Sequence, residues 1–382
     1  MIKNIHEIRD PIHVFIKLDS QERQVLGSQP VQRLRHINQL ALTYLLYPGA
    51  THKRFEHSLG VMELASRIFD VVTNPEHLSD NIRDLFPQIN DPDKCKYWRR
   101  ILRMAALCHD IGHLPFSHAS EDELLPNAWN HEKITRELIF SDQMQPIWDD
   151  LEPPLKPEHI VKLALGKKEA PDLEFTDWEI MLAEIIVGDA FGADRMDYLL
   201  RDSFHTGVAY GKFDHFRLID SLRILPPPAS GKEGEISNEP SLGVESGGMH
   251  SAEALLLARY FMFSQVYFHP IRRIYDIHLK DFLLDWLEQG EFSTEPDEFL
   301  LFTDAEITSA LRRAASDASQ PGHKHAERII KRKHFKVVYE RNPDDIKKNI
   351  GVPVASLLKE PNEKEFGKEK VRIDTLPAKG GT

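Results

Sequence analysis

The 382-residue sequence has very little cysteine and no long apolar run. Its two cysteines, Cys95 and Cys108, cannot build a disulfide framework, which favours a reducing compartment. No segment approaches the roughly 18 consecutive apolar residues of a membrane-spanning helix, and Met1–His6 has no hydrophobic signal region. We therefore expect a cytoplasmic protein with no membrane association.

Net positive charge is missing as well. The formal net charge is −12, which argues against broad binding to nucleic acid, because such binding needs a basic footprint. Acidic residues are nevertheless absent between Gln24 and Phe55. The basic side chains of that stretch are Arg33, Arg35, Lys53 and Arg54. This local excess of positive charge indicates either a basic surface loop or a region that attracts phosphate.

Apolar spacing of three and four residues predicts a mostly α-helical chain. The clearest interruption is the polar stretch from Pro226 to Gly248, whose flanks are expected to pair as a hairpin with a long polar tip. Helical spacing returns afterwards, and the alternation at His334–Glu340 predicts a strand. We expect a core over residues 1–224, a hairpin with a polar insertion over 225–250, a helical lobe over 251–332, and a small α+β appendage and tail over 333–382.

The densest cluster of titratable side chains is Cys108–His118, with three histidines and one aspartate. His109 and Asp110 are neighbours, so on a regular helix their side chains would diverge by about 100°. Gly112 and Pro115 prevent the preceding apolar helix from continuing, and at a helix end both side chains can reach one metal. Imidazole and carboxylate together indicate a mixed N/O metal site.

Two other segments supply candidate ligands. His57 lies in Arg54–Gly60, which opens an apolar-periodic helix, and Asp194 heads a second helical segment that ends at Asp202. Within that second segment, Asp197 and Arg201 are four residues apart and are expected to form an exposed or structural ion pair.

These residues resemble the metal ligands of the HD phosphohydrolase superfamily, in the order His57, His109, Asp110 and Asp194. The longer strings Pro48–Gly60 and His109–His118 resemble the deoxynucleoside triphosphate (dNTP) triphosphohydrolases, meaning the SAM-and-HD-domain enzyme and its prokaryotic relatives. The resemblance begins near residue 10, so we expect no SAM domain in this chain. It implies an HD-domain helical core with a small α+β C-terminal lobe, which hydrolyses dNTPs to deoxynucleoside and inorganic triphosphate.

The resemblance also implies a cofactor of one or two divalent metal ions. The sequence does not distinguish among Mg, Mn, Fe, Co, Ni and Zn. Outside the ligands, the resemblance implies an acid/base dyad of His131 with Glu121, and protonation of the departing 5′ oxygen by His118 or His113. His118 and Glu121 are three residues apart, which is consistent with one helical face.

The resemblance further implies a substrate pocket made by Gln39, Leu40, Arg54, Arg195, Tyr198, Asp202 and Tyr275. Gln39 would bond the 3′ hydroxyl, and Leu40 would crowd a 2′ hydroxyl. Arg54 would contact phosphate, as would Arg195, which stands where the family has a lysine. Tyr275 would stack under the sugar. One phosphate-binding arginine of the family has no match, and a tyrosine, Tyr267, lies near its position.

Relatives in this family assemble as tetramers with activator nucleotides, so we expect a homo-oligomer, a dimer or a tetramer. Gln32 and Arg35 match part of the activator site, but Gly27 replaces an expected aspartate, which argues against guanine-specific activation. The basic run Lys331–Lys333 is either a nucleotide-phosphate contact or a solvated helix end. Two alternatives remain open: an HD-type single-strand nuclease or nucleotidase, and a non-catalytic nucleotide-sensing module.

Overall fold

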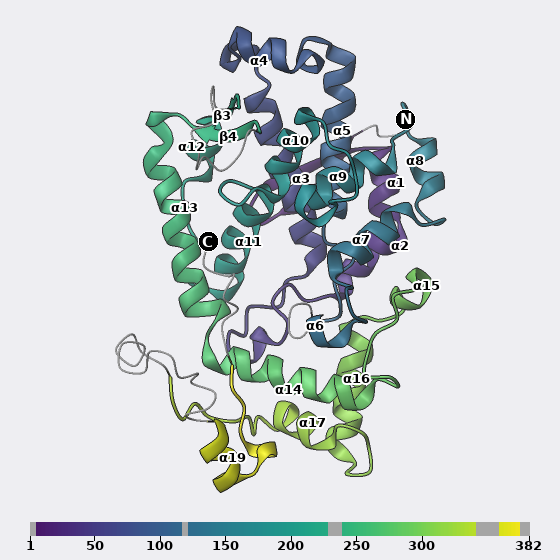
Figure 1. The fold of residues 1–382 in the computed structure, drawn as a ribbon, viewed down its shortest axis with the longest axis vertical. Helices are drawn as coiled ribbons and strands as arrows, with labels where there is room; N and C mark the ends of the chain where they lie inside the picture. The colour runs from purple at the N-terminus through teal and green to yellow at the C-terminus, as the bar shows by residue number, and fades with distance from the viewer. Residues whose placement is uncertain (1–4, 117–120, 228–238, 341–358, 375–382) are drawn as a thin grey trace.

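The computed structural model describes residues 5–116, 121–227, 239–340 and 359–374, and these residues are mostly helical (Figure 1). The expectation of a mostly α fold is confirmed. The first part of the described chain contains β1 (Ile5–Asp10), β2 (Val14–Asp19), α1 (Glu22–Gly27), α2 (Gln29–Arg33), α3 (Arg54–Val72), α4 (Asp80–Leu85) and α5 (Pro92–Cys108).

The middle of the chain carries a series of shorter helices and one strand. Its elements are α6 (Glu121–Leu124), α7 (His131–Phe140), α8 (Gln145–Asp150), α9 (Pro157–Glu169), α10 (Asp177–Val187), α11 (Ala193–Thr206), α12 (His215–Asp220) and β3 (Leu222–Leu225). Polar side chains set where several of these helices begin. For example, the Asn130 side chain accepts a hydrogen bond from the Lys133 N–H and so caps α7.

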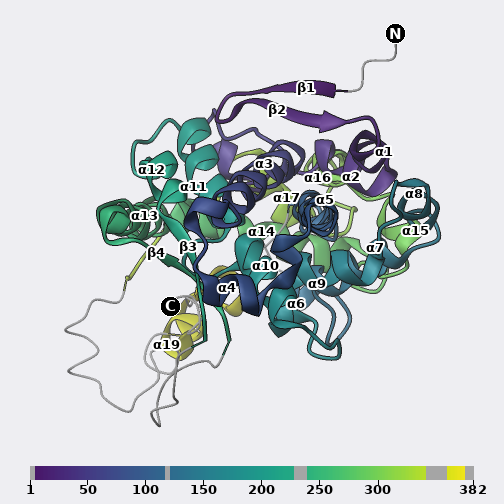
Figure 2. The same cartoon turned by 90° about the horizontal axis from the view of Figure 1, so that it is seen from above.

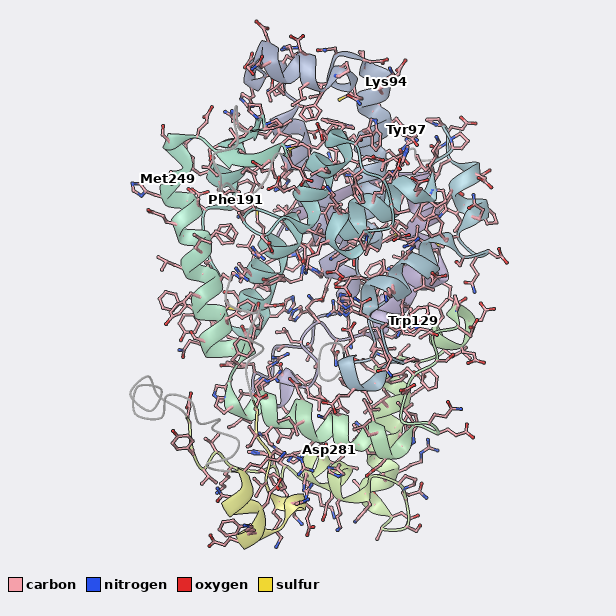
Figure 3. All side chains as sticks on the ribbon, in the orientation of Figure 1. Lys94, Tyr97, Trp129, Phe191, Met249 and Asp281 are labelled. Carbon is pink, nitrogen blue, oxygen red and sulfur yellow. The ribbon has the colours of Figure 1, made fainter. Side chains whose placement is uncertain are left out.

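The remaining elements are β4 (Ser241–Val244), α13 (Met249–Met262), α14 (Pro270–Trp286), α15 (Pro296–Phe299), α16 (Asp304–Ser316), α17 (His323–Ile330) and α19 (Glu360–Phe366). A π-helical turn at Phe263–Tyr267 separates α13 from α14. Helix α13 runs along one edge of the molecule, with the exposed Met249 at one end (Figure 3). In the same view, Asp281 marks α14, which lies across the molecule below α3 and α11.

Two antiparallel strand pairs accompany the helices. β1 pairs with β2 from Ile5 opposite Asp19 to Asp10 opposite Val14, and this hairpin lies along one side of the helical core (Figure 2). β3 pairs with β4, with Leu225 opposite Ser241. The second hairpin confirms the pairing expected across the polar interruption, whereas most of its tip, residues 228–238, lies outside the described residues.

The strand predicted at His334–Glu340 is wrong. The structure describes these residues and gives them no regular secondary structure. The first two of them contact α14 instead of a neighbouring strand: the His334 ring lies against Tyr275, and the Phe335 N–H donates to Nε2 of His278. A sheet ladder needs a partner edge, and here two side chains of α14 take its place.

Buried apolar side chains form one cluster that runs from Ile16 in β2 to Ile329 in α17. Helix α3 lies inside it and packs against both α5 and α11. The three helices that carry the predicted ligands are therefore fixed by the same core. In the part of the chain that the structure describes, no helix is both long and apolar enough to cross a membrane. The predicted domain boundaries stay a prediction.

Candidate active site

Three of the four predicted metal ligands converge on one point. His57 lies in the first turn of α3, His109 follows the last residue of α5, and Asp194 lies in the first turn of α11. One ligand atom from each residue lies within 4.8 Å of the other two. The shortest of these approaches joins His57 Nε2 to Asp194 Oδ1 at 3.0 Å. Helix ends, as the sequence predicted, bring these side chains together.

Asp110, the fourth predicted ligand, borders this group. Its Oδ1 lies 3.3 Å from His109 Nε2 and its Oδ2 lies 3.6 Å from His57 Nε2. The same carboxylate accepts a hydrogen bond from the Arg54 guanidinium, and Oδ1 lies 3.2 Å from His113 Nε2. Asp110 therefore faces both predicted histidine ligands and is shared with two other candidate site residues.

The imidazole of His109 tests whether a cation fits between these groups. Its Nδ1 donates a hydrogen bond to the Ala106 carbonyl at 2.8 Å, so in the neutral ring Nε2 carries the lone pair. This Nε2 is buried and has no hydrogen-bond partner among the described residues. It instead faces the Oδ1 atoms of Asp110 and Asp194, at 3.3 Å and 3.5 Å. A lone pair opposite two carboxylates is repulsive, and a divalent cation between them removes the conflict.

The protonation of His57 supports the same conclusion. Burial alone would lower its pKa, but hydrogen bonds to Asp194 and Asp197 outweigh burial and raise the pKa to about 10. In Asp194, the two histidines overcome the opposing effect of burial and lower the pKa of the carboxyl. The centre therefore attracts positive charge strongly, as a site whose ligands are two imidazoles and two carboxylates should.

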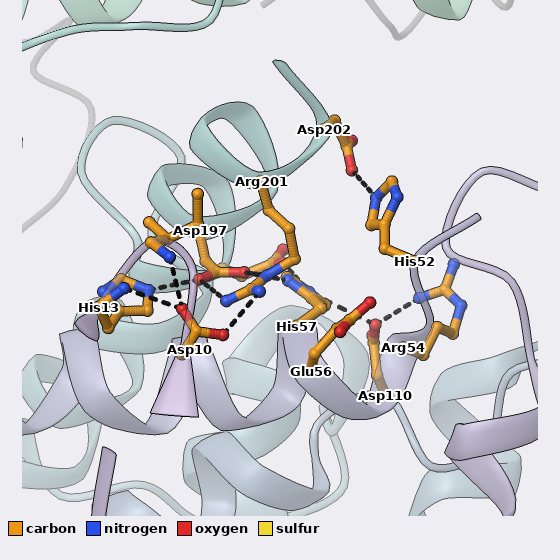
Figure 4. Close-up of polar contacts among 12 residues, drawn as sticks. Asp10, His13, His52, Arg54, Glu56, His57, Asp110, Asp197, Arg201 and Asp202 are labelled. Carbon is orange, nitrogen blue, oxygen red and sulfur yellow. Dashed lines mark hydrogen bonds and ion pairs between the residues drawn. The ribbon is translucent and has the colours of Figure 1, made fainter. Parts of the chain in front are cut away.

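A buried charge network supports His57 from behind (Figure 4). Its Nδ1 donates to Asp197 Oδ2 at 2.8 Å, and Asp197 also accepts from His13 Nε2 at 2.7 Å and from Arg201 Nε at 2.8 Å. Arg201 in turn donates to Asp10 Oδ2 at 2.9 Å. A carboxylate on the second nitrogen of a ligand histidine fixes its tautomer and orientation.

The ion pair expected between Asp197 and Arg201 is present, and of its two forms, exposed or structural, the structural one is confirmed, because both side chains are fully buried. Gly60 was the available clue. It lies one turn after His57 on α3, and a Cβ placed there would meet Asp197 Oδ1 at 1.9 Å. Only glycine leaves room for this pair behind the histidine.

A second cluster holds the predicted acid/base residues. His131 Nδ1 lies 2.7 Å from Glu121 Oε1, and the His131 ring stacks on His113 with centroids 3.9 Å apart. The structure thus brings together three of the four residues predicted for this role. His118 lies outside the described residues.

The two stacked rings differ in their proton affinity. Burial, helped by the positive charge of Arg54 and of His131, holds the pKa of His113 well below its usual value. Burial also opposes the charged form of His131, but the Glu121 carboxylate outweighs it and raises the pKa of His131. His131 is therefore the ring of this pair with the higher affinity for a proton.

The predicted sugar side centres on Asp202. Its two oxygens accept hydrogen bonds from His52 Nε2 and from the Tyr267 hydroxyl, each at 2.7 Å. The Gln39 N–H donates to the His52 carbonyl at 3.0 Å, which places Gln39 beside the same group. Sequence reasoning missed His52 and Tyr267 as partners of Asp202. The one sequence signal for Tyr267 was its place near a position where the resembled family has an arginine.

The other predicted substrate residues lie in different surroundings. The Tyr198 ring meets Tyr267 edge-on at 6.0 Å, and burial raises the pKa of Tyr198 to about 12. Arg195 Nε and Nη1 are buried without a hydrogen-bond partner among the described residues. Leu40 is buried, and Tyr275 is also buried, with its ring 5.0 Å from His334. The packing of Tyr275 is that of a core aromatic.

Comparison with known sequences finds two family descriptions in this chain. An HD domain matches residues 54–197, and an HD associated region matches residues 213–365. The first match contains every ligand described above, from the start of α3 to the first turn of α11.

Several individual proteins are similar to this chain. An uncharacterized protein of Methanocaldococcus jannaschii is 36% identical over 72% of this chain and 48% of its own length. The human deoxynucleoside triphosphate triphosphohydrolase SAMHD1 is 29% identical over 96% of this chain and 60% of its own length. The chain therefore spans about half to three fifths of these curated relatives. A crystal structure of a hypothetical protein from Aquifex aeolicus, 33% identical, superposes with a TM-score of 0.74 over 97% of this chain and 85% of the other.

Proposed function

Because this chain belongs to the family of proteins built on the HD domain, we propose that it is a metal-dependent phosphohydrolase. We propose further that it converts dNTPs to deoxynucleoside and inorganic triphosphate. The observation that carries the proposal is the group of His57, His109 and Asp194, in which a buried, unpartnered imidazole nitrogen of His109 faces two carboxylates. The likeness to the human enzyme, which is named for dNTP hydrolysis, supports the choice of substrate.

The residues that would hold the divalent ion are His57, His109, Asp110 and Asp194. Such an ion, when bound, polarises a phosphoryl oxygen and lowers the pKa of water. The mixed N/O ligand set is compatible with several divalent metals, so its chemistry alone selects none of them. Asp197 would keep His57 in the tautomer whose Nε2 points at the ion.

Proton transfer is assigned to the second cluster. Hydrolysis of the ester bond requires a proton for the departing 5′ oxygen of the nucleoside. The pairing with Glu121, which overcomes the opposing effect of burial and raises the pKa of His131, supports His131 with Glu121 as the acid/base dyad. His118 and His113 were the donors predicted for the 5′ oxygen. His118 remains one, whereas His113, whose pKa is lowered by burial, would act as a neutral ring that stacks on His131 and bonds Asp110.

The substrate would lie between these clusters and the sugar side. The two unpartnered donors of Arg195 support a phosphate contact. Arg54 donates to Asp110, so it would also steady that carboxylate. Gln39 and Asp202 would hold the 3′ hydroxyl, Tyr198 would line the same side, and Leu40 would exclude a 2′ hydroxyl. Tyr275 would have to leave its contact with His334 to stack under the sugar.

Assembly and activation are also part of the proposal. A homo-oligomer with nucleotide between its subunits remains the expectation from the family. Gln32 and Arg35 already bond to each other, and Lys331 and Lys333 both contact Glu327. An activator phosphate would therefore have to compete with ion pairs within the chain.

Substrate comparison tests the proposed function. The ratio kcat/KM is measured for one dNTP, its 2′,3′-dideoxy analogue, the matching ribonucleotide and a short single-stranded DNA. The dNTP should exceed the dideoxy compound by up to about 10⁴-fold, because the groups that bind the 3′ hydroxyl would be left unpaired. The ribonucleotide, rejected by crowding at Leu40, should trail by roughly 10- to 10³-fold.

Gln39→Ala should reduce the lead over the dideoxy analogue, whereas the control Gln143→Ala, an exposed glutamine paired with Asp297, should not. Equal rates on all three nucleotides would contradict the substrate assignment. Faster cleavage of the DNA would favour the nuclease alternative instead.

A further inference from the structure

Asp304, the first residue of α16, joins two segments of the candidate site that are far apart in the sequence. Its side chain is buried, with 5% of the residue exposed. Oδ2 accepts a hydrogen bond from the Asn38 N–H at 2.7 Å, and Oδ1 accepts one from the Phe116 N–H at 2.8 Å. One carboxylate of the HD associated region therefore bonds two backbone segments that flank the proposed substrate.

The first of these segments leads to the sugar side. Asn38 directly precedes Gln39, whose N–H bonds the His52 carbonyl, and His52 bonds Asp202. Asn38 is also bridged to Lys53, the residue before α3. A shift of Asn38 would thus displace both the proposed 3′-hydroxyl contacts and the start of α3, the helix that carries His57.

The second segment leads to the acid/base cluster. Phe116 follows His113 by three residues, and its backbone adopts a left-handed conformation with φ of 56°. A non-glycine residue keeps that conformation only where its surroundings hold it. The backbone N–H of this same residue donates the hydrogen bond that Asp304 Oδ1 accepts. Although burial raises the pKa of Asp304 to about 6, the group is ionised at neutral pH, and each oxygen accepts one of the two bonds.

Arg33 provides a second connection between the same parts. Its Nη1 donates to the His113 carbonyl and its Nε donates to the Phe302 carbonyl, each at 2.9 Å. The guanidinium lies over the Phe299 ring, 4.3 Å from its centroid. The loop that carries His113 is therefore held at both ends, through Arg33 at His113 and through Asp304 at Phe116.

We propose that Asp304 and Arg33 form a positioning clamp, through which the HD associated region sets the spacing between the sugar-side segment and the acid/base loop. Neither residue is assigned a contact with substrate. The role rests on the proposed function, because the loop matters only if His113 and its neighbours take part in the reaction. The clamp gives the C-terminal lobe a direct part in turnover and in sugar selectivity.

Asp304→Asn tests the clamp with almost no change in size. An amide presents one oxygen and one NH2 group, so one of the two backbone N–H groups loses its acceptor. The matched control is Glu306→Gln, which removes the carboxylate that bonds Thr303 at the start of the same helix and that accepts no hydrogen bond from Asn38 or Phe116. Both variants are compared with wild type for amide hydrogen exchange, metal content, kcat, KM and the dNTP-to-ribonucleotide preference.

Asp304→Asn should speed amide exchange at Asn38, Phe116 or both. It should also lower kcat by roughly 10²-fold, the cost of a small misplacement of reacting groups, and narrow the sugar preference, with metal content unchanged. Glu306→Gln should show none of these changes. Unaltered exchange at both amides, or the same losses in Glu306→Gln, would overturn the clamp.

Should Asp304→Asn fail to fold, Arg33→Lys decides, because a single ammonium replaces the fork that reaches both carbonyls. Wild-type turnover and sugar preference retained in Arg33→Lys would overturn the clamp, and a selective loss of kcat would support it. Hydrogen exchange requires no turnover. Protection at Asn38 and Phe116 that depends on Asp304, in a chain that hydrolyses no dNTP, would leave the clamp standing and count against the proposed function alone.

Discussion

The metal side of the candidate site lies on helices, whereas two residues of the substrate side, Gln39 and His113, lie on loops that other parts of the chain hold in place. His57, His109 and Asp194 occupy the ends of α3, α5 and α11, which share one apolar core. Gln39 and His113 lie between helices and depend on hydrogen bonds from distant segments. Substitutions on the metal side should therefore reduce metal binding by removing charge. Substitutions on the substrate side should reduce turnover by displacing Gln39 or His113.

The largest effect is expected on the metal side. Asp110→Ala removes a carboxylate that faces both histidine ligands and leaves Arg54 without that partner. It should abolish stoichiometric metal binding and hydrolysis together, as shown by elemental analysis and a turnover assay. Asp172→Ala, which removes an exposed partner of Arg136, is the control. A metal-free Asp110→Ala protein with full activity would end the HD-hydrolase assignment.

The next effect should separate the two sides. His131→Ala is expected to keep its metal while losing about 10²- to 10⁴-fold in turnover, the usual contribution of a positioned proton donor or acceptor. Metal content and kcat are measured on the same samples, with the exposed His250→Ala as the control. If metal content and kcat fall in proportion, His131 supports the metal centre, and the assignment of separate roles to the metal side and the substrate side is wrong.

A third change concerns the residue that orients His57. Asp197→Asn keeps the size of the side chain but removes the charge that His13, His57 and Arg201 share. Metal affinity should fall by roughly 10- to 100-fold, the usual effect of removing a residue that hydrogen-bonds a metal ligand. Competition with a chelator measures this, with Asp172→Asn as the control. An unchanged affinity would show that α3 alone orients the histidine.

The smallest predicted effect is a shift in pH dependence. Burial lowers the pKa of His131, and the Glu121 carboxylate overcomes burial and raises it. A proton donor loses activity as the pH rises through its pKa, so this loss should begin at lower pH in Glu121→Gln than in wild type. The exposed Glu137→Gln should keep the wild-type profile of kcat/KM. An unchanged loss of activity at high pH would contradict the donor role, and a gain of activity that moves to lower pH at the acid end of the profile would show that His131 acts in its neutral form.

The helix ends that carry the metal side could be predicted from the sequence because the features that form them are local. A glycine and a proline after an apolar helix place His109 and Asp110 at a helix end, and helical periodicity starts α3 at Arg54. The same reasoning could not find Asp304 or Tyr267, whose partners lie 266, 188 and 65 positions away along the chain. It also gave His334–Glu340 a strand, because alternation alone does not reveal whether a partner edge exists.

Product analysis with a single dNTP is the most direct test of the proposed dNTP triphosphohydrolase activity. Purified protein with its divalent metal is incubated with the nucleotide, and the phosphate product and the nucleoside product are both quantified, with Asp110→Ala as the blank. We expect inorganic triphosphate and deoxynucleoside in equal amounts, and neither in the blank. Pyrophosphate with a monophosphate, phosphate with a diphosphate, or equal release by Asp110→Ala would contradict the proposed function.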